Sequence, residues 1–147
     1  MKTGKRTKAL ALFCALAAAS AVVVGAGPAQ ADSAAQTAAS ICGSGYSPDA
    51  AYGLQGGTIY VSYNGYTDCA VLIKTVDVGT PTETWVYAAL DSSGTGGYGG
   101  NDGYRDDGSF SYYAGPVRVD APHKCIEVAG GTVLPNDEIR ESRVLCG

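Results

Sequence analysis

The chain contains a single histidine, His123, which limits the acid–base chemistry open to it. A serine hydrolase needs a histidine base beside its nucleophile and a carboxylate behind that base. Serine and aspartate are plentiful, but there is no nucleophile-elbow motif, and His123 stands between Pro122 and Lys124 close to a cysteine. The sequence also has no motif that identifies a pair of carboxylates for glycoside hydrolysis. We interpret His123 as a surface residue of a turn, assign no catalytic residue and predict that the protein is not an enzyme.

A glycine-rich segment carries four oxygen-bearing side chains that raise the question of calcium binding. They are Asn101, Asp102, Asp106 and Asp107. Calcium takes roughly six to eight oxygen ligands, and an EF-hand loop places them at alternating positions before a closing glutamate. This segment has neither that alternation nor that glutamate. We interpret it as a solvated acidic loop and predict no metal site and no cofactor.

Ten tyrosines and one tryptophan give the chain its clearest compositional feature. Tyrosine suits half-buried strand faces, where the ring packs and the hydroxyl stays wet, and this role accounts for most of the ten. Aromatic rings also stack on sugars and anchor protein interfaces. The candidate binding surface combines residues beside a predicted hairpin turn, in a predicted loop and on a predicted strand: Tyr63, Tyr66, Trp85, Tyr98 and Tyr104.

Residues 1–31 have the pattern of a secretory signal peptide. Lysine and arginine are frequent in the first eight residues, an apolar run covers residues 9–25, and the small residues Ala29 and Ala31 stand at the −3 and −1 positions before Asp32. We therefore expect cleavage before Asp32, no membrane anchor afterwards, and a secreted protein that works outside the cell. Cys14 would be discarded with the leader.

Removal of the leader leaves a strongly acidic chain. Four of the ten Lys and Arg residues but none of the 14 Asp and Glu residues lie before residue 32. The mature chain would carry six basic and 14 acidic residues, a formal net charge of −8. Such a chain without a basic cluster is a poor candidate for binding nucleic acid or an anionic membrane.

Four cysteines remain in the mature chain: Cys42, Cys69, Cys125 and Cys146. An even number in a short exported chain indicates two disulfides, and three pairings are possible. We favour Cys42–Cys69 with Cys125–Cys146, because each pair joins near neighbours and closes a modest loop. The chain has no C-x-x-C motif, which disfavours zinc binding and thioredoxin-like chemistry.

Residues 58–63 and 69–76 are rich in β-branched and aromatic side chains and flank Asn64-Gly65, which predicts a hairpin. A two-residue loop would pair Tyr63 with Tyr66, whereas a four-residue loop would pair Tyr63 with Asp68. We prefer the four-residue loop, because it places four apolar residues on one face. These residues are Ile59, Val61, Ala70 and Leu72.

The remaining elements predict an all-β fold, a small antiparallel sandwich or barrel with two disulfides. A further strand is expected at residues 84–90, with weaker ones at 109–114, 117–119, 125–128 and 138–145. Residues 91–108 contain seven glycines and are expected to form a loop. No helix is predicted. We expect residues 32–40 to be a flexible N-terminal arm and residues 41–147 to be a single disulfide-linked β domain.

Several short motifs occur in a characteristic order along the mature chain. They are Cys42-Gly43-Ser44-Gly45-Tyr46 and residues 57–64, 69–71, 113–117, 125–126 and 146–147. With the four cysteines, this order resembles the spore-associated protein A family of streptomycetes and related actinobacteria. Residues 127–131 keep the glycines that follow the third cysteine in that family but lack its tryptophan.

The resemblance implies a small exported protein that is found with spores or in the medium and has no established activity or cofactor. Our main hypothesis is a non-catalytic secreted protein associated with the spore or cell envelope and acting by surface contact. Its expected partner is the spore or cell-wall surface, including its polysaccharide. The alternatives are a carbohydrate- or cell-wall-binding module that uses Trp85 and exposed tyrosines, and a secreted protease inhibitor.

Overall fold

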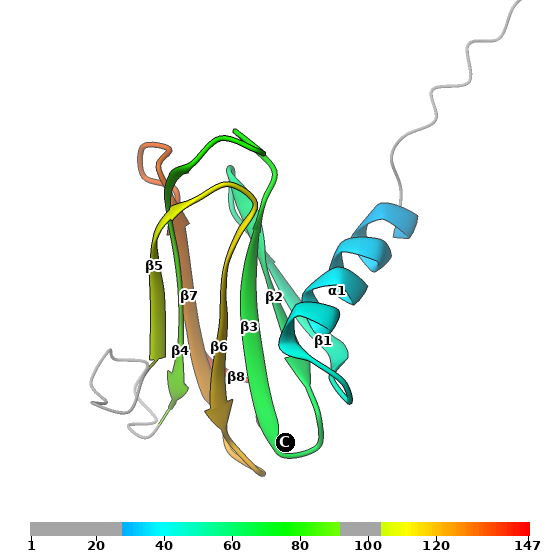
Figure 1. Cartoon of the computed structure of the whole chain (residues 1–147). Coiled ribbons are helices and arrows are strands. Elements are labelled where there is room, and N and C mark those ends of the chain that lie inside the picture. The colour runs from blue at the N-terminus through cyan, green and yellow to red at the C-terminus, as the bar shows by residue number, and fades with distance from the viewer. Residues whose placement is uncertain (1–27, 92–103) are drawn as a thin grey trace, which may run out of the picture.

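Two antiparallel sheets of four strands each pack face to face, and one helix lies against the outside of the first sheet (Figure 1). The computed structural model describes residues 28–91 and 104–147, with side chains from Ser33 onward. The all-β prediction is confirmed, and the architecture is the sandwich rather than the barrel. In the part of the chain that is described, no helix has the length and apolar character needed to cross a membrane.

The described chain passes from one sheet to the other three times, after the third, fifth and sixth strands. The first sheet has the order β1-β2-β3-β6, with β1 at Ser47–Gly53, β2 at Gly57–Tyr63, β3 at Thr67–Lys74 and β6 at Tyr113–Asp120. The second has the order β5-β4-β7-β8, with β4 at Thr82–Leu90, β5 at Tyr104–Phe110, β7 at Ile126–Thr132 and β8 at Glu138–Val144.

The β2–β3 hairpin has the predicted four-residue loop, with Tyr63 paired to Asp68. Asn64 Oδ1 accepts hydrogen bonds from the backbone N–H groups of Tyr66, at 3.0 Å, and Thr67, at 2.8 Å. Gly65 has a φ of 97°, a conformation that glycine adopts without a steric penalty. The Asn-Gly pair thus sets the turn, and the turn sets which side chains face the core.

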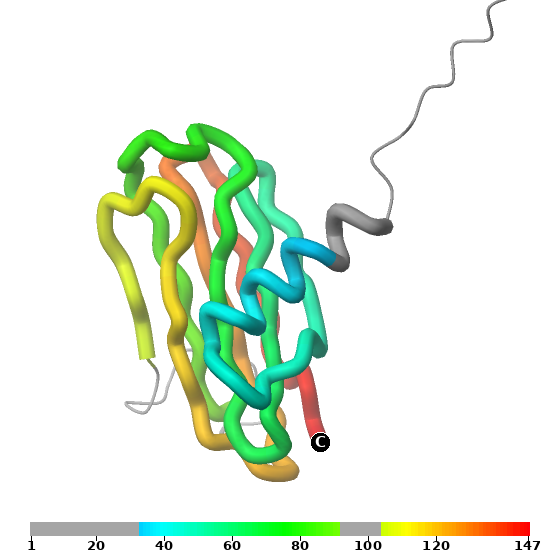
Figure 2. The backbone as a smooth tube through the Cα atoms, turned by 45° about the vertical axis from the view of Figure 1, so that its right-hand side comes forward, coloured from blue at the N-terminus to red at the C-terminus, as the bar shows by residue number. Residues whose placement is uncertain are grey.

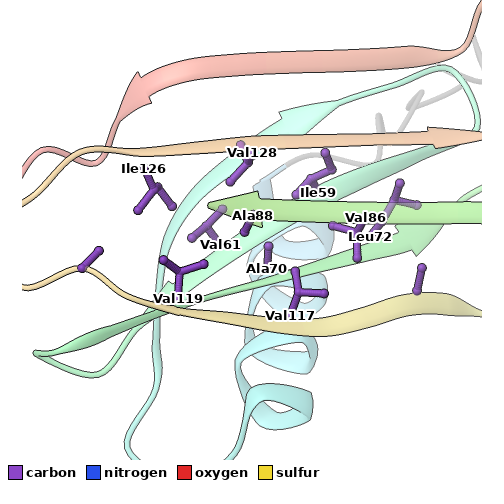
Figure 3. Close-up of a cluster of buried hydrophobic side chains, with 12 residues drawn as sticks. Ile59, Val61, Ala70, Leu72, Val86, Ala88, Val117, Val119, Ile126 and Val128 are labelled. Carbon is purple, nitrogen blue, oxygen red and sulfur yellow. The ribbon is translucent and has the colours of Figure 1, made fainter. Parts of the chain in front are cut away.

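The core lies between the sheets and is built from alternate residues of the central strands (Figure 3). Ile59, Val61, Ala70 and Leu72 all belong to it, as the preferred register requires. From the second sheet, Val86 and Val128 pack against them. A Cβ at Gly130 would stand 2.9 Å from the methyl groups of Ile59 and Leu72 and 3.0 Å from the Trp85 carbonyl oxygen, so a larger residue there would require the core to shift.

The expectation of a flexible arm over residues 32–40 is wrong, because α1 spans Pro28–Cys42. Ala38 and Cys42 are buried with Cys69 and Val71 on the outer side of the first sheet. Alanine has the highest helix propensity, and its small side chain lets a helix approach a sheet closely. The Ala, Ser and Thr residues of this segment provide little hydrophobic contrast, so its helical period was not recognised.

Both disulfides have the favoured pairing. Cys42–Cys69 joins the end of α1 to β3 with a sequence separation of 27 residues. Cys125–Cys146 joins the residues flanking the β7–β8 hairpin with a separation of 21 residues. The first bond fixes the helix to the sheet, and the second closes one end of the sandwich.

Three other segments differ from their predictions. Residues 109–114 are not one strand, because β5 ends at Phe110 and the chain reverses before β6 begins at Tyr113. Tyr104–Phe110 forms β5, so the end of the predicted loop at 91–108 is an edge strand. β1 was not predicted, because it is a largely exposed edge strand of small and polar residues. Residues 92–103 lie outside the described part of the chain.

Candidate functional site

The structure distributes the predicted binding residues over different parts of the sandwich. Tyr63 and Tyr66 lie at the β2–β3 hairpin, whereas Trp85 lies in the middle of β4 in the other sheet. Tyr104 begins β5 and is 60% exposed. It pairs with Ala88, which faces the core, so Tyr104 and Trp85 belong to opposite faces of the second sheet. Tyr98 lies outside the described residues.

Trp85 occupies the outer face of the second sheet between two arginines. The Arg105 guanidinium carbon lies 4.3 Å from the centroid of the indole ring, and that of Arg140 lies 5.9 Å away. Both distances are within the range of cation–π attraction. Gly131 makes room for the indole, because a Cβ there would stand 2.5 Å from Nε1. The tryptophan is therefore only 9% exposed although it faces outward.

Each of the two arginines forms an ion pair with a carboxylate of the same face. Arg105 Nε lies 3.1 Å from Asp107 Oδ1, and Arg140 Nε lies 3.6 Å from Glu138 Oε1. Tyr87 is the next residue along β4 that faces the same side as Trp85. Its hydroxyl donates a 3.0 Å hydrogen bond to Glu127 Oε1. We call this surface the open face and define it by Trp85, Tyr87, Arg105, Arg140 and their carboxylate partners.

The outer faces of the two sheets differ in how they are covered. α1 contacts β1, β2 and β3 and shields the outside of the first sheet, as both views of the backbone show (Figure 2). None of the described elements lies over the outside of the second sheet. Within the open face Trp85 and Glu127 are buried, at 9% and 5% exposed, whereas the side chains of Arg105 and Arg140 are 47% and 48% exposed, so the accessible groups of this face are charged.

The β2–β3 hairpin and the C-terminal residues lie at the same end of the sandwich (Figure 2). A cavity of about 240 Å³ is lined by residues from this end. We call it the end pocket. It is lined by two carboxylates, a tyrosine, small and apolar residues and a disulfide cysteine: Asp49, Tyr63, Asp68, Ala121, Leu145, Cys146 and Gly147.

The strand geometry explains why the two carboxylates meet in the end pocket. Asp68 lies two residues before the core residue Ala70 on β3, and Tyr63 lies two residues after the core residue Val61 on β2. Both therefore face the same side of the sheet as the core residues. On β1, the pairing with β2 shifts between Pro48 and Ala50, which leaves Asp49 in a β-bulge. Bulges change the direction in which a side chain points and are frequent next to functional sites.

The Asp68 carboxyl group has an unusual environment. Burial, and secondly the nearby Asp49 carboxylate, raise the pKa of Asp68 to about 6. The residue is only 3% exposed, and no described residue donates a hydrogen bond to its carboxylate. The pKa of Tyr52 is also raised, first by burial and then by the charges of Glu141, Asp49 and Asp68. The end pocket is therefore a site of negative potential.

The residues considered for calcium and for catalysis have other positions. Asp106 Oδ2 accepts a 2.7 Å hydrogen bond from the N–H of Gly115, and Asp107 pairs with Arg105. Asn101 and Asp102 lie outside the described residues. Across residues 28–91 and 104–147, no three His, Cys, Asp or Glu side chains form a group that could hold a metal ion. His123 is exposed in a turn with a φ of 56°, as expected for a turn-surface residue.

Sequence reasoning did not identify the end pocket or the arginines of the open face. A signal for the pocket was present in Asp68, a charged residue in line with the apolar residues Ala70 and Leu72. Arg105 and Arg140 lie on strands that flank Trp85 only after folding, and neither is near it in sequence.

Comparison with known proteins shows that the chain is similar in sequence to a curated protein. Spore-associated protein A of Streptomyces coelicolor is 37% identical over 93 residues, which are 61% of this chain and 55% of that protein. The chain thus spans about half the length of this relative. No protein-family model and no solved structure matches the chain. The similarity to the Streptomyces protein agrees with the resemblance to the spore-associated protein A family that the sequence motifs indicate.

Proposed function

We propose that this is a non-catalytic secreted protein that associates with the spore or cell envelope by direct contact through the open face. The observation that carries the proposal is the asymmetry of the sandwich. α1 covers the outside of the first sheet, whereas the second sheet presents Trp85, Arg105 and Arg140 outward. The name of the Streptomyces relative, spore-associated protein A, supports a spore as the surface that is contacted.

The packing of the open face favours polar contacts over ring stacking. Because Arg105 lies 4.3 Å from the indole centroid, a sugar ring cannot stack on that side of Trp85 unless the guanidinium moves. Arginine presents its N–H donors in a fixed plane, and stacking on tryptophan reduces the side-chain freedom that would be lost on binding. The carboxylates of Asp107 and Glu138 supply acceptors beside these donors. The open face therefore suits a polar polymer surface, bound through charged groups.

Co-sedimentation of the mature chain with intact spores and with vegetative cells tests the proposal. Arg105→Ala and Arg140→Ala should each weaken binding to spores by roughly fivefold, because each removes a central arginine of the contact surface. Lys124→Ala is the matched control, since it removes one positive charge from an exposed turn away from the open face. Thermal melting of each variant separates lost contact from lost folding.

The salt dependence of release is a second measurement in the same assay. Contacts made by exposed charged groups weaken at high ionic strength, so about 1 M salt should release the protein and a non-ionic detergent should not. Equal binding of all three variants would contradict a contact through the open face. Absence of binding to spores and cells would contradict envelope association as a whole.

A further inference from the structure

Four charged residues are buried within the described part of the chain, and three of them are satisfied by hydrogen bonds. Lys74 Nζ donates to Thr82 Oγ1 at 2.6 Å and to three backbone carbonyls, the nearest at 2.8 Å. Asp137 accepts from two backbone N–H groups, at 2.7 and 2.8 Å, and Glu127 accepts from Tyr87. Asp68 is the fourth, and no described residue bonds to its carboxylate.

A carboxylate that is 3% exposed and accepts no hydrogen bond from a described residue is costly, because its charge loses most of its contact with water and gains no partner in exchange. The cost at Asp68 is increased by Asp49, a second carboxylate on the wall of the same pocket. None of the described residues lining the end pocket is a lysine, arginine or histidine. The pocket thus has the charge pattern of a site that is completed by a cation from outside.

The rest of the lining indicates what kind of cation fits. Calcium prefers roughly six to eight oxygen ligands, whereas a large part of this pocket is apolar, with Ala121, Leu145 and Cys146 among its lining residues. An organic ammonium group has the complementary structure. Its N–H groups can donate to the carboxylates, its alkyl chain can contact Leu145 and Ala121, and its charge is attracted to an aromatic ring such as that of Tyr63.

We infer that the end pocket binds a primary alkylammonium group, with Asp68 and Asp49 as its anionic partners and Tyr63 and Leu145 as its aromatic and apolar walls. The group can be a free alkylamine or the side chain of a lysine, since both present the same chemistry. The site is at the end of the sandwich and not on the open face, so it goes beyond the proposed function and its test does not depend on that function.

Isothermal titration calorimetry of the mature chain at pH 7.5 tests this inference, with n-butylamine hydrochloride as the first probe. n-Butanol is the neutral counterpart of the same length, and potassium chloride controls for ionic strength. We expect saturable binding of butylamine and none of butanol. Nα-acetyl-lysine methylamide distinguishes the sources: binding as strong as that of butylamine assigns the site to a lysine side chain, and weaker binding assigns it to a free amine.

Three conservative variants locate the binding site. Asp68→Asn and Asp49→Asn should each weaken butylamine binding at least tenfold, because each replaces a negative charge with an amide of the same shape. Asp77→Asn is the matched control, since Asp77 lies in the exposed loop after β3 at the opposite end of that strand. Binding that is equal in all three variants would overturn the assignment to the end pocket.

Two further results would overturn the inference. One is the absence of saturable butylamine binding to the wild-type chain. The other is binding of calcium chloride that both Asp→Asn variants of the pocket abolish while butylamine neither binds nor competes, since that would identify a metal site. Thermal melting of Asp68→Asn and Asp49→Asn confirms that each variant is folded when its binding is measured.

Discussion

The environment of Asp68 links the end pocket to the stability of the fold. Its pKa is raised to about 6 in the folded protein, compared with about 4 for an unfolded aspartate. Well below pH 4 the carboxyl group is protonated in both the folded and the unfolded protein, so its burial as a charge does not reduce the free energy of unfolding. As the pH rises through 6, the folded state must hold a buried negative charge, so the stability present at low pH is lost.

Replacing Asp68 with asparagine should therefore stabilise the protein in a pH-dependent way. At pH 7.5 we expect Asp68→Asn to raise Tm by about 5 °C, the shift that corresponds to about 1 kcal/mol for a domain of this size. At pH 4 the variant and the wild type should melt at similar temperatures. Circular dichroism melts at the two pH values measure the difference, and His123, present in both proteins, does not contribute to it. A variant less stable than wild type at pH 7.5 would show that the carboxylate is satisfied in the folded chain.

At the scale of elements, a single carboxylate connects the two sheets at the end opposite the end pocket. Asp137 precedes β8 in the second sheet and accepts hydrogen bonds from the backbone of Gln55 and Gly56, which join β1 to β2 in the first. It also accepts a short hydrogen bond from the Thr132 hydroxyl at the end of β7. The residue is only 6% exposed, so most of the hydrogen-bonding capacity of its carboxylate is used within the protein.

We expect Asp137→Ala to destabilise the protein by about 3 kcal/mol, because it leaves two backbone N–H groups without their acceptor in a buried site. Asp137→Asn should cost less, since the amide oxygen still accepts one of these bonds. Asp107→Asn serves as a control that removes only an exposed ion pair, and it should change stability by less than about 0.5 kcal/mol. Urea denaturation of the three variants gives the values. Equal stability of Asp137→Ala and Asp107→Asn would contradict a structural role for Asp137.

The elements also differ in how well the sequence predicts them. The β2–β3 hairpin was predicted with its register, because Asn64-Gly65 restricts the turn and the apolar alternation of Ile59, Val61, Ala70 and Leu72 selects one pairing. α1 was missed because its packing depends on small residues rather than on a hydrophobic stripe. β1 and β5 were missed because edge strands with one exposed face carry polar sequences that are also typical of loops.

At the scale of the whole molecule, the candidate sites were only partly predictable from the sequence. Trp85 and Tyr63 were named as binding residues because aromatic types are recognisable without knowledge of the fold. Their partners come from segments distant in sequence: Arg105 and Arg140 lie near Trp85 from β5 and β8, and Leu145, after β8, lines the same pocket as Tyr63. Such neighbours are determined by strand order, which local sequence patterns do not encode.

The two disulfides link the stability of the whole molecule to whether its surroundings are oxidising or reducing. Their separations of 27 and 21 residues correspond to about 3 kcal/mol of stabilisation each by the loop-entropy estimate. Small domains have a total stability of about 5–15 kcal/mol, so the two bonds together account for a large share of it. We therefore expect the chain to fold most stably where disulfides persist, as they do outside the cell.

Reduction should therefore lower Tm by about 20 °C or unfold the protein outright, as measured by circular dichroism melts with and without a phosphine reductant. The paired variant Cys42→Ala/Cys69→Ala should lose about half of this stability and should also free α1, because the disulfide and the packing of Ala38 and Val71 together hold the helix to the first sheet. The paired variant Cys125→Ala/Cys146→Ala is the matched comparison, since it opens a loop of similar length without touching α1. A Tm that is unchanged on reduction would mean that the sandwich core alone provides the stability, and the link between this fold and an oxidising compartment would then be lost.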